Sequence, residues 1–264
     1  MALTKRTTEA GGVKFDLLEG GSGPALLFLH DGEGVSGSLP ILERLAASFR
    51  VVAPSMPGFG TSSLPAWIDR ADDFAYPLLD LIEQSKLTDV VLTGASFGGW
   101  VAAEMAAKTC ERLSRLVLVA PLGIKVGSRD QLDMPDLFAK TVEEGHELMF
   151  ANPENAKRDF SKFSDEELAS VARSRETIAL TAWDPYMHNP KLRHRLHRIS
   201  VPTLVLRGAE DAFTPASYTQ SFANLIPQSR LQAISGGGHF VHIEKPAEVA
   251  EAIEGFAARA VAQA

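Results

Sequence analysis

Hydrophobic and polar residues follow two different periods along this chain. Residues 25–29 form a short, continuous apolar run bounded by turn-forming residues, which is typical of a strand buried on both faces of a sheet. Residues 13–18 alternate between apolar and polar as an edge strand does. Further strands are predicted from similar runs at 50–53, 90–93, 116–120, 203–206 and 230–234.

Stretches with helical spacing lie between these runs. They cover residues 39–48, 74–85, 100–108, 217–225 and 246 to about 262. Strands and helices in alternation predict an α/β fold, in which a mostly parallel sheet is covered by helices on both faces.

The alternation is interrupted between residues 122 and 198, where no convincing buried strand occurs. Ser164-Asp-Glu-Glu167 is a capping box that predicts the start of a helix, and Asn-Pro and Asp-Pro pairs divide the rest. We therefore expect a core domain made of residues 1–121 and 199–264, with residues 122–198 inserted as a helical lid.

Composition narrows the range of possible partners. The 264 residues are 45% hydrophobic, and 26 basic against 33 acidic residues give a net charge of −7. This balance disfavours nucleic acid and anionic membranes as partners. Cys110 is the only cysteine, so no intrachain disulfide can form, and we interpret it as a packing residue. The polar N-terminus lacks an apolar signal core, and a cytoplasmic protein is expected.

The strongest chemical motif is Gly94-Ala-Ser-Phe-Gly98, which matches G-x-S-x-G. It follows a predicted buried strand and is followed at once by a predicted helix. That context is typical of a nucleophile elbow, in which a strained turn exposes the serine hydroxyl above the sheet. The sequence therefore predicts Ser96 as a nucleophile.

A serine hydroxyl is a weak nucleophile and needs a base within hydrogen-bond reach. In this arrangement the chain order is serine, then an acid, then histidine. Glu210 and Asp211 follow the predicted strand 203–206, so either can be the acid. His239 follows a glycine-rich turn and is the expected base, with His242 and His30 as rivals. The pair His194 and His197 lacks further ligands nearby in sequence, so we expect no metal and no cofactor.

Ester cleavage also requires N–H donors for the oxyanion of the tetrahedral intermediate. One is expected from Phe97, the residue after the nucleophile. The other should come from the loop His30-Asp-Gly-Glu-Gly34 after the strand 25–29, where Gly32 is the first candidate and Asp31 the rival.

Taken in order, the motifs at 26–34, 53–60, 94–99, 208–211 and 238–239 resemble the α/β-hydrolase superfamily, most closely its capped esterases and carbon–carbon bond hydrolases. The resemblance implies an eight-stranded, mostly parallel sheet, a helical cap, and a triad of Ser96, Asp211 and His239. The chain departs from many relatives at Asp31, where they have glycine, and at Ala95, where they have histidine or asparagine. Ser55 replaces an aspartate that often precedes Pro-Gly-x-Gly.

The expected reaction is hydrolysis of a small carboxylic ester through an acyl-enzyme on Ser96. Carbon–carbon bond hydrolysis of a diketone or ring-cleavage product, acyl transfer or lyase chemistry, and ligand reception with vestigial hydrolysis stay open as alternatives. The substrate is expected to be a small molecule with an apolar acyl or aromatic group, and the oligomeric state does not follow from the sequence. Pocket walls are expected from Phe138, Leu148, Met149, Phe150, Trp183, Tyr186 and Phe213.

Overall fold

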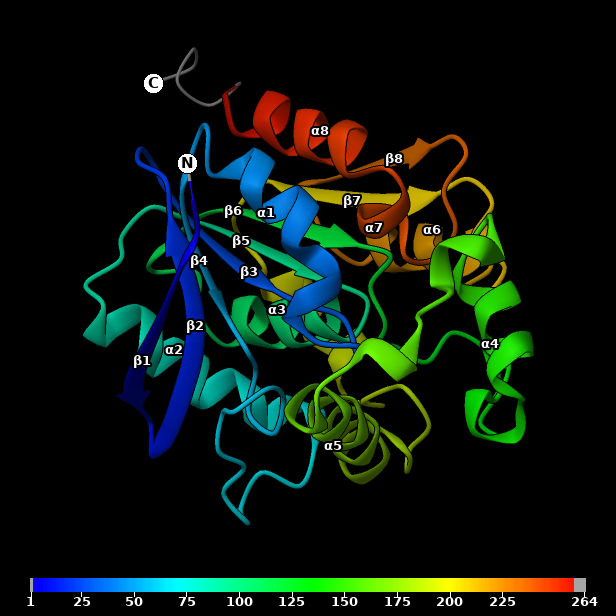
Figure 1. The fold of residues 1–264 in the computed structure, drawn as a ribbon. Helices are drawn as coiled ribbons and strands as arrows, with labels where there is room; N and C mark the ends of the chain where they lie inside the picture. Colours follow the sequence, from blue (N-terminus) through cyan, green and yellow to red (C-terminus); the bar gives the residue numbers. More distant parts are fainter. Residues whose placement is uncertain (1, 259–264) are drawn as a thin grey trace.

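An eight-stranded sheet runs through residues 2–258, the part of the chain that this computed structural model describes (Figure 1). Its strand order is β1-β2-β4-β3-β5-β6-β7-β8. β1 and β2 are antiparallel to each other, β2 is antiparallel to β4, and all later pairs are parallel. The strands are β1 (Thr4–Ala10), β2 (Val13–Gly20), β3 (Ala25–Leu29), β4 (Arg50–Pro54), β5 (Val90–Ala95), β6 (Leu113–Val119), β7 (Thr203–Gly208) and β8 (Ser229–Ile234).

The central strands are the apolar runs of the sequence. All six residues of β5 and all six of β7 are buried, because helices cover both faces of the parallel part of the sheet. The predicted α/β architecture is confirmed. The prediction of an edge strand at 13–18 is wrong, since β2 lies between β1 and β4. β1 escaped prediction because five of its seven residues are exposed, so it shows no apolar period.

Helices pack on the sheet in two layers, each with its own hydrophobic cluster. In Figure 1, α1 and α8 lie on one side of the sheet and α2 and α3 on the other, where α6 also packs. α8 begins at Pro246, as expected, and the predicted helical residues after 258 lie outside the described part. The bounds are α1 (Leu39–Leu45), α2 (Ala75–Gln84), α3 (Phe97–Lys108), α6 (Ala216–Asn224), the short α7 (Val241–Glu244) and α8 (Pro246–Ala258).

Between β6 and β7 the described chain holds only helices and loops, apart from one isolated bridge between Gly123 and His188. α5 (Asp165–Ala182) begins at the predicted capping box, in which Ser164 and Glu167 exchange hydrogen bonds. α4 (Val142–Met149) begins at a second box that the sequence reading missed, and Figure 1 places α4 beyond the tips of β7 and β8. The 3-10 helices are Val35–Ser38, Ala71–Phe74, Leu137–Ala139, Pro153–Ala156, Phe160–Lys162, Leu192–His194 and Leu196–Arg198.

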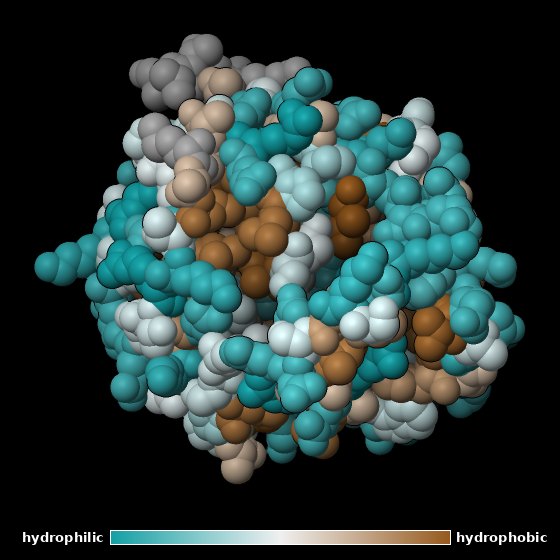
Figure 2. Space-filling view, in the orientation of Figure 1, coloured by the Kyte–Doolittle hydropathy of each residue, from teal (hydrophilic) through white to brown (hydrophobic). Residues whose placement is uncertain are grey.

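On the face drawn in Figure 2 hydrophilic residues predominate and hydrophobic residues gather in a few separate patches. No helix within residues 2–258 combines the length and apolar character needed to cross a bilayer.

Candidate active site

Ser96 occupies the sharp turn between β5 and α3. Its backbone angle φ is 51°, a left-handed conformation that residues other than glycine seldom adopt. The neighbouring glycines are required by contact: a Cβ on Gly94 would lie 2.2 Å from the carbonyl oxygen of Gly98, and a Cβ on Gly98 would lie 2.3 Å from that of His30. The local sequence thus forces strand and helix close together and raises the serine above the sheet.

Three side chains that are distant in sequence meet at this turn. The Oγ of Ser96 lies 2.9 Å from Nε2 of His239, and Nδ1 of His239 lies 3.0 Å from Oδ2 of Asp211. A carboxylate can only accept, so the imidazole proton on this side is carried by Nδ1. Nε2 is then free to accept the proton of the Ser96 hydroxyl. The geometry is that of a nucleophile, a base and an orienting acid.

Asp211 is held by its own loop as well as by His239. Its Oδ1 accepts hydrogen bonds from the backbone N–H groups of Phe213 at 3.0 Å and Thr214 at 2.8 Å, and its Oδ2 accepts one from the Thr214 hydroxyl. Burial acts to raise the pKa of Asp211, but the His239 ring and the Thr214 donors outweigh it and hold this pKa below its ordinary value. The carboxyl is therefore charged at neutral pH.

The rival residues are bonded elsewhere. Glu210 is exposed and accepts a hydrogen bond from the N–H of Gly237. His242 contacts Asp31 at 2.8 Å rather than Ser96. His30 accepts from the backbone N–H of Met56 at 2.9 Å, which occupies its Nε2.

Phe97 and Gly32 both border the space around Ser96. Phe97 is the first residue of α3, and the first N–H groups of a helix have no acceptor within the helix. Gly32 lines the same pocket as Ser96 and Phe97, and its N–H has no acceptor among residues 2–258. Asp31 is fully buried and lies outside the pocket wall, whereas Gly32 lines it.

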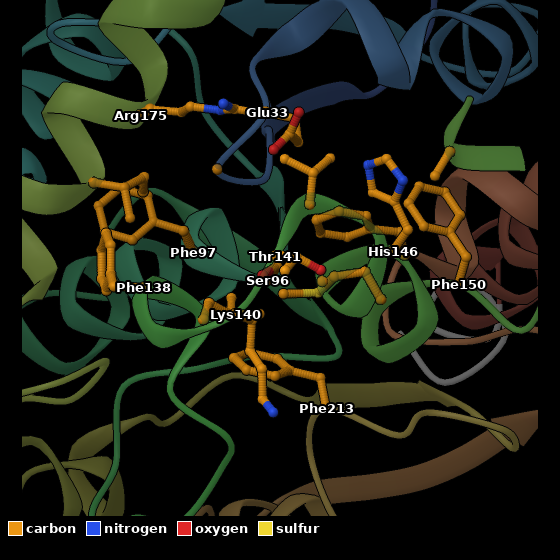
Figure 3. Close-up of a pocket in the computed structure, with 18 of the residues that line it drawn as sticks. Glu33, Ser96, Phe97, Phe138, Lys140, Thr141, His146, Phe150, Arg175 and Phe213 are labelled. Carbon is orange, nitrogen blue, oxygen red and sulfur yellow. The ribbon is translucent and has the colours of Figure 1, made fainter. Parts of the chain in front are cut away.

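A cavity of about 330 Å³ opens above Ser96. Figure 3 shows Ser96 at the centre, with Phe97 and Phe138 to one side and His146 and Phe150 to the other. Apolar side chains make up most of the wall: Phe97, Leu122, Leu137, Phe138, Val142, Met149, Phe150, Ala156, Phe160, Ile178, Met187, Phe213 and Phe240.

The wall also carries titratable side chains that were not predicted from the sequence as pocket residues. They are Glu33, Lys140, His146, Arg158 and Arg175. Glu33 belongs to the loop already singled out for oxyanion binding, so its position could have been found. The others come from the helical segment 122–198, whose path over the sheet has no signal in the sequence.

Glu33 lies close to the arginines of this set. Its carboxylate is 3.3 Å from the Arg158 guanidinium, and Figure 3 shows it on the same side of the pocket as Arg175. Burial and the charge of Asp31 nevertheless raise the pKa of Glu33, against the pull of Arg158, Arg175 and His146. One edge of the pocket thus combines a carboxyl with two guanidinium groups.

Four of the expected pocket residues do line the cavity: Phe138, Met149, Phe150 and Phe213. Trp183, Tyr186 and Leu148 are not among the residues that line it. Trp183 is 52% exposed and packs edge-on against Phe138 with 4.5 Å between ring centroids. Tyr186 donates its hydroxyl proton to the carbonyl of Pro135, and Leu148 also lies outside the wall. Trp183 and Tyr186 pack against Phe138, and neither lines the cavity.

No group of three or more histidine, cysteine or acidic residues within 2–258 is placed to hold a metal ion. The chemistry that the site offers is that of the serine, the imidazole and the backbone donors.

Comparison with known proteins agrees with the fold. The profile of the α/β hydrolase fold family matches residues 24–246. The chain belongs to this family. It is, more narrowly, a hydrolase of that fold, in keeping with relatives whose names are those of hydrolases.

The relatives are similar to this chain over nearly its whole length. It is 29% identical to the 2-hydroxymuconate semialdehyde hydrolase of Pseudomonas sp. (strain CF600), over 97% of this chain and 94% of that protein. A thermophilic esterase from Thermogutta terrifontis has a TM-score of 0.76 at 25% identity, covering 98% of this chain and 99% of the other. The 2-hydroxy-6-oxo-6-phenylhexa-2,4-dienoate hydrolase of Rhodococcus sp. strain RHA1 has a TM-score of 0.77 at 20% identity, covering 97% and 98%.

Proposed function

We propose that this protein hydrolyses a small carboxylic ester through an acyl-enzyme on Ser96. The observation that carries the proposal is the continuous chain of hydrogen bonds, here called the relay, from the Ser96 hydroxyl through His239 to the buried Asp211 carboxylate. Ser96 attacks the substrate carbonyl carbon while its proton passes to Nε2 of His239. The C–O bond of the ester then breaks, and the leaving alcohol takes that proton.

The second half of the reaction uses the same groups. Water gives a proton to His239 and attacks the acyl carbon, and the bond to Ser96 breaks as the serine recovers its proton. Asp211 holds the imidazole in the correct tautomer and stabilises the imidazolium in both halves. The N–H groups of Phe97 and Gly32 are proposed to bind the oxyanion that forms each time.

The helical segment 122–198 is proposed to act as a lid over the core domain formed by residues 1–121 and 199–264. The pocket wall supports this, because α4 and α5 supply Met149 and Ile178 to the cavity that contains Ser96. The cavity volume of about 330 Å³ suits a small substrate, and Phe138, Phe150 and Phe213 suit an apolar acyl or aromatic group.

A panel of p-nitrophenyl esters of increasing acyl length tests the proposal, with Ser96→Ala as the matched variant. Wild-type protein should release nitrophenol and should be labelled by a fluorophosphonate. Ser96→Ala should lose both while keeping its thermal unfolding temperature, with kcat reduced by about 10⁶ as in subtilisin. A folded Ser96→Ala variant that retained most of the esterase activity would contradict the assignment.

Carbon–carbon bond hydrolysis is the second candidate, and a different observation favours it. Arg158 and Arg175 place two guanidinium groups in the pocket wall, which suits a substrate with a carboxylate. The name of a relative from Pseudomonas putida, 28% identical over 91% of this chain, specifies a heptadienoate. A dienoate ring-cleavage product with a 6-oxo group should then lose its near-ultraviolet absorbance faster than the best ester is hydrolysed. The ratio of the two kcat/KM values decides between the candidates.

A further inference from the structure

A second buried histidine–carboxylate pair lies beside the candidate active site. Nε2 of His242 is 2.8 Å from Oδ2 of Asp31, and both side chains are fully buried. Neither residue lines the pocket, and neither bonds to the Ser96, His239 or Asp211 side chains. The proposed reaction therefore gives this pair no direct part.

The pair joins two loops that must keep a fixed relation for catalysis. Asp31 follows β3 in the loop that supplies Gly32, and His242 lies in α7, three residues after His239. Since a carboxylate only accepts, His242 donates from Nε2 and fixes the orientation of the Asp31 carboxylate. This contact between residues 211 positions apart in sequence connects the loop at residues 30–34, here called the oxyanion loop, to the segment that carries His239.

The other oxygen of the same carboxylate acts on the oxyanion loop itself. Oδ1 of Asp31 accepts a hydrogen bond from the backbone N–H of Glu33 at 2.7 Å. This is an Asx turn, and it closes around Gly32, so it determines how the two peptide planes flanking Gly32 are oriented. Asp31 thereby controls the direction of the unpaired Gly32 N–H without touching the substrate.

Stability alone is a poor explanation for this arrangement. Removing a carboxylate from water costs several kcal/mol, and replacing a buried ionic pair by apolar side chains is often neutral or stabilising. Here the carboxylate satisfies one loop N–H and one imidazole at a place where many members of the family have glycine. What it provides is a defined loop geometry.

We propose that Asp31 and His242 are positioning residues that hold the Gly32 N–H toward the oxyanion. This inference rests on the proposed serine hydrolase function. Loss of an oxyanion donor lowers kcat by about 10²–10³, so a misdirected donor should lower it by about 10- to 100-fold. Because the donor acts on the charge that forms during the reaction, kcat should fall while KM changes little.

The experiment compares Asp31→Ala with Asp31→Asn. The asparagine can still accept from Glu33 N–H, and its amide can face His242, so kcat should recover to within several-fold of wild type. The alanine variant keeps neither bond. His242→Phe fills the same space without a donor and serves as an independent second variant, with His242→Gln as its donor-retaining counterpart.

A peptide-free trifluoromethyl ketone supplies a readout that a merely structural role would not move. It forms a hemiketal oxyanion with Ser96, so its inhibition constant should rise in parallel with the loss of kcat in Asp31→Ala and His242→Phe. Leu45→Ala, a buried change in α1 away from the pocket, is the control for lost stability. It should lower the unfolding temperature while leaving kcat and the inhibition constant as in wild type.

The outcomes separate this inference from the proposed function. If wild-type protein neither hydrolysed esters nor reacted with a fluorophosphonate, the function would be wrong and the positioning role would fall with it. If wild type were active and both Asp31→Ala and His242→Phe kept wild-type kcat and ketone affinity, only the positioning role would be overturned. Should Asp31→Ala fail to fold, the comparison of His242→Phe with His242→Gln decides it by the same readouts.

Discussion

Replacing Asp211 by asparagine should disable the site while leaving its shape intact. In the wild type, Oδ1 accepts from the N–H groups of Phe213 and Thr214, so the asparagine oxygen must take that place. The amide nitrogen is then left facing Nδ1 of His239, 3.0 Å away, and it can only donate there. His239 must accept on Nδ1 and carry its proton on Nε2, where it faces Ser96 and cannot act as a base.

The size of the effect follows from this tautomer change. The equivalent change in serine proteases lowers kcat by about 10⁴, which corresponds to about 5 kcal/mol of transition-state stabilisation. We expect a similar loss of kcat for Asp211→Asn, with KM close to that of wild type because no pocket residue is altered. Steady-state kinetics on the best p-nitrophenyl ester measures it, and the rate of fluorophosphonate labelling should fall with kcat.

Glu210→Gln is the matched control, because Glu210 is the adjacent acid and bonds to Gly237 rather than to His239. Its kcat should stay close to that of wild type. If Asp211→Asn kept full activity while Glu210→Gln lost it, the orienting role would belong to Glu210. If both variants were fully active and folded, the relay would not be the source of nucleophilicity at all.

Three further predictions concern the lid, the pocket charge and acid stability. Glu244 accepts hydrogen bonds from the N–H groups of Gly238 and Ala151, and so connects the loop before His239 to the residues after α4. Glu244→Ala should therefore lower the free energy of unfolding in urea by about 2 kcal/mol and lower kcat, and an unchanged unfolding curve would contradict this. Glu33→Gln removes a negative charge beside Arg158, so KM for carboxylate-bearing substrates should fall by up to about fivefold with neutral esters unaffected; equal effects on both classes would refute it. The pKa of Asp211 is lower in the folded than in the unfolded protein, so its contribution to stability is full above the unfolded pKa of about 4 and is lost as the pH falls through the folded value. The free energy of unfolding of Asp211→Asn should therefore decrease less steeply in acid than that of wild type.

The sequence predicted the sheet well wherever burial is two-sided. β3, β5 and β7 are continuous apolar runs because helices cover both faces, and runs this short between turn residues are typical of buried strands. β1 has no such constraint. It is held by its ladder to β2, in which Thr4 pairs with Glu19 and Ala10 with Val13, while most of its side chains remain in solvent. A strand held by backbone hydrogen bonds alone shows no hydrophobic periodicity in its sequence, so β1 could not be predicted from the sequence.

The relay was predictable for a different reason. Ser96, Asp211 and His239 each follow a predicted strand, and the carboxyl ends of parallel strands meet at one edge of the sheet. The lid offers no comparable rule. Trp183 and Phe138 are both large and aromatic in sequence, yet only Phe138 reaches the cavity, and Trp183 packs on its outer side. Which face of a lid residue points inward depends on how the lid packs, and that is decided by tertiary contacts alone.

Asp31 shows where a local reading reverses once the fold is known. In the sequence, Asp31 stands where many relatives have glycine, at a position next to the expected oxyanion donor. In the fold, its carboxylate receives Glu33 N–H on one side and His242 on the other, so the departure is compensated twice. A glycine at this position would allow the loop several backbone conformations, whereas Asp31 restricts it to one through hydrogen bonds to its own turn and to α7. The two buried carboxylates of the site therefore have parallel duties: Asp211 orients the base, and Asp31 orients the loop that is to meet the charge this base helps to create.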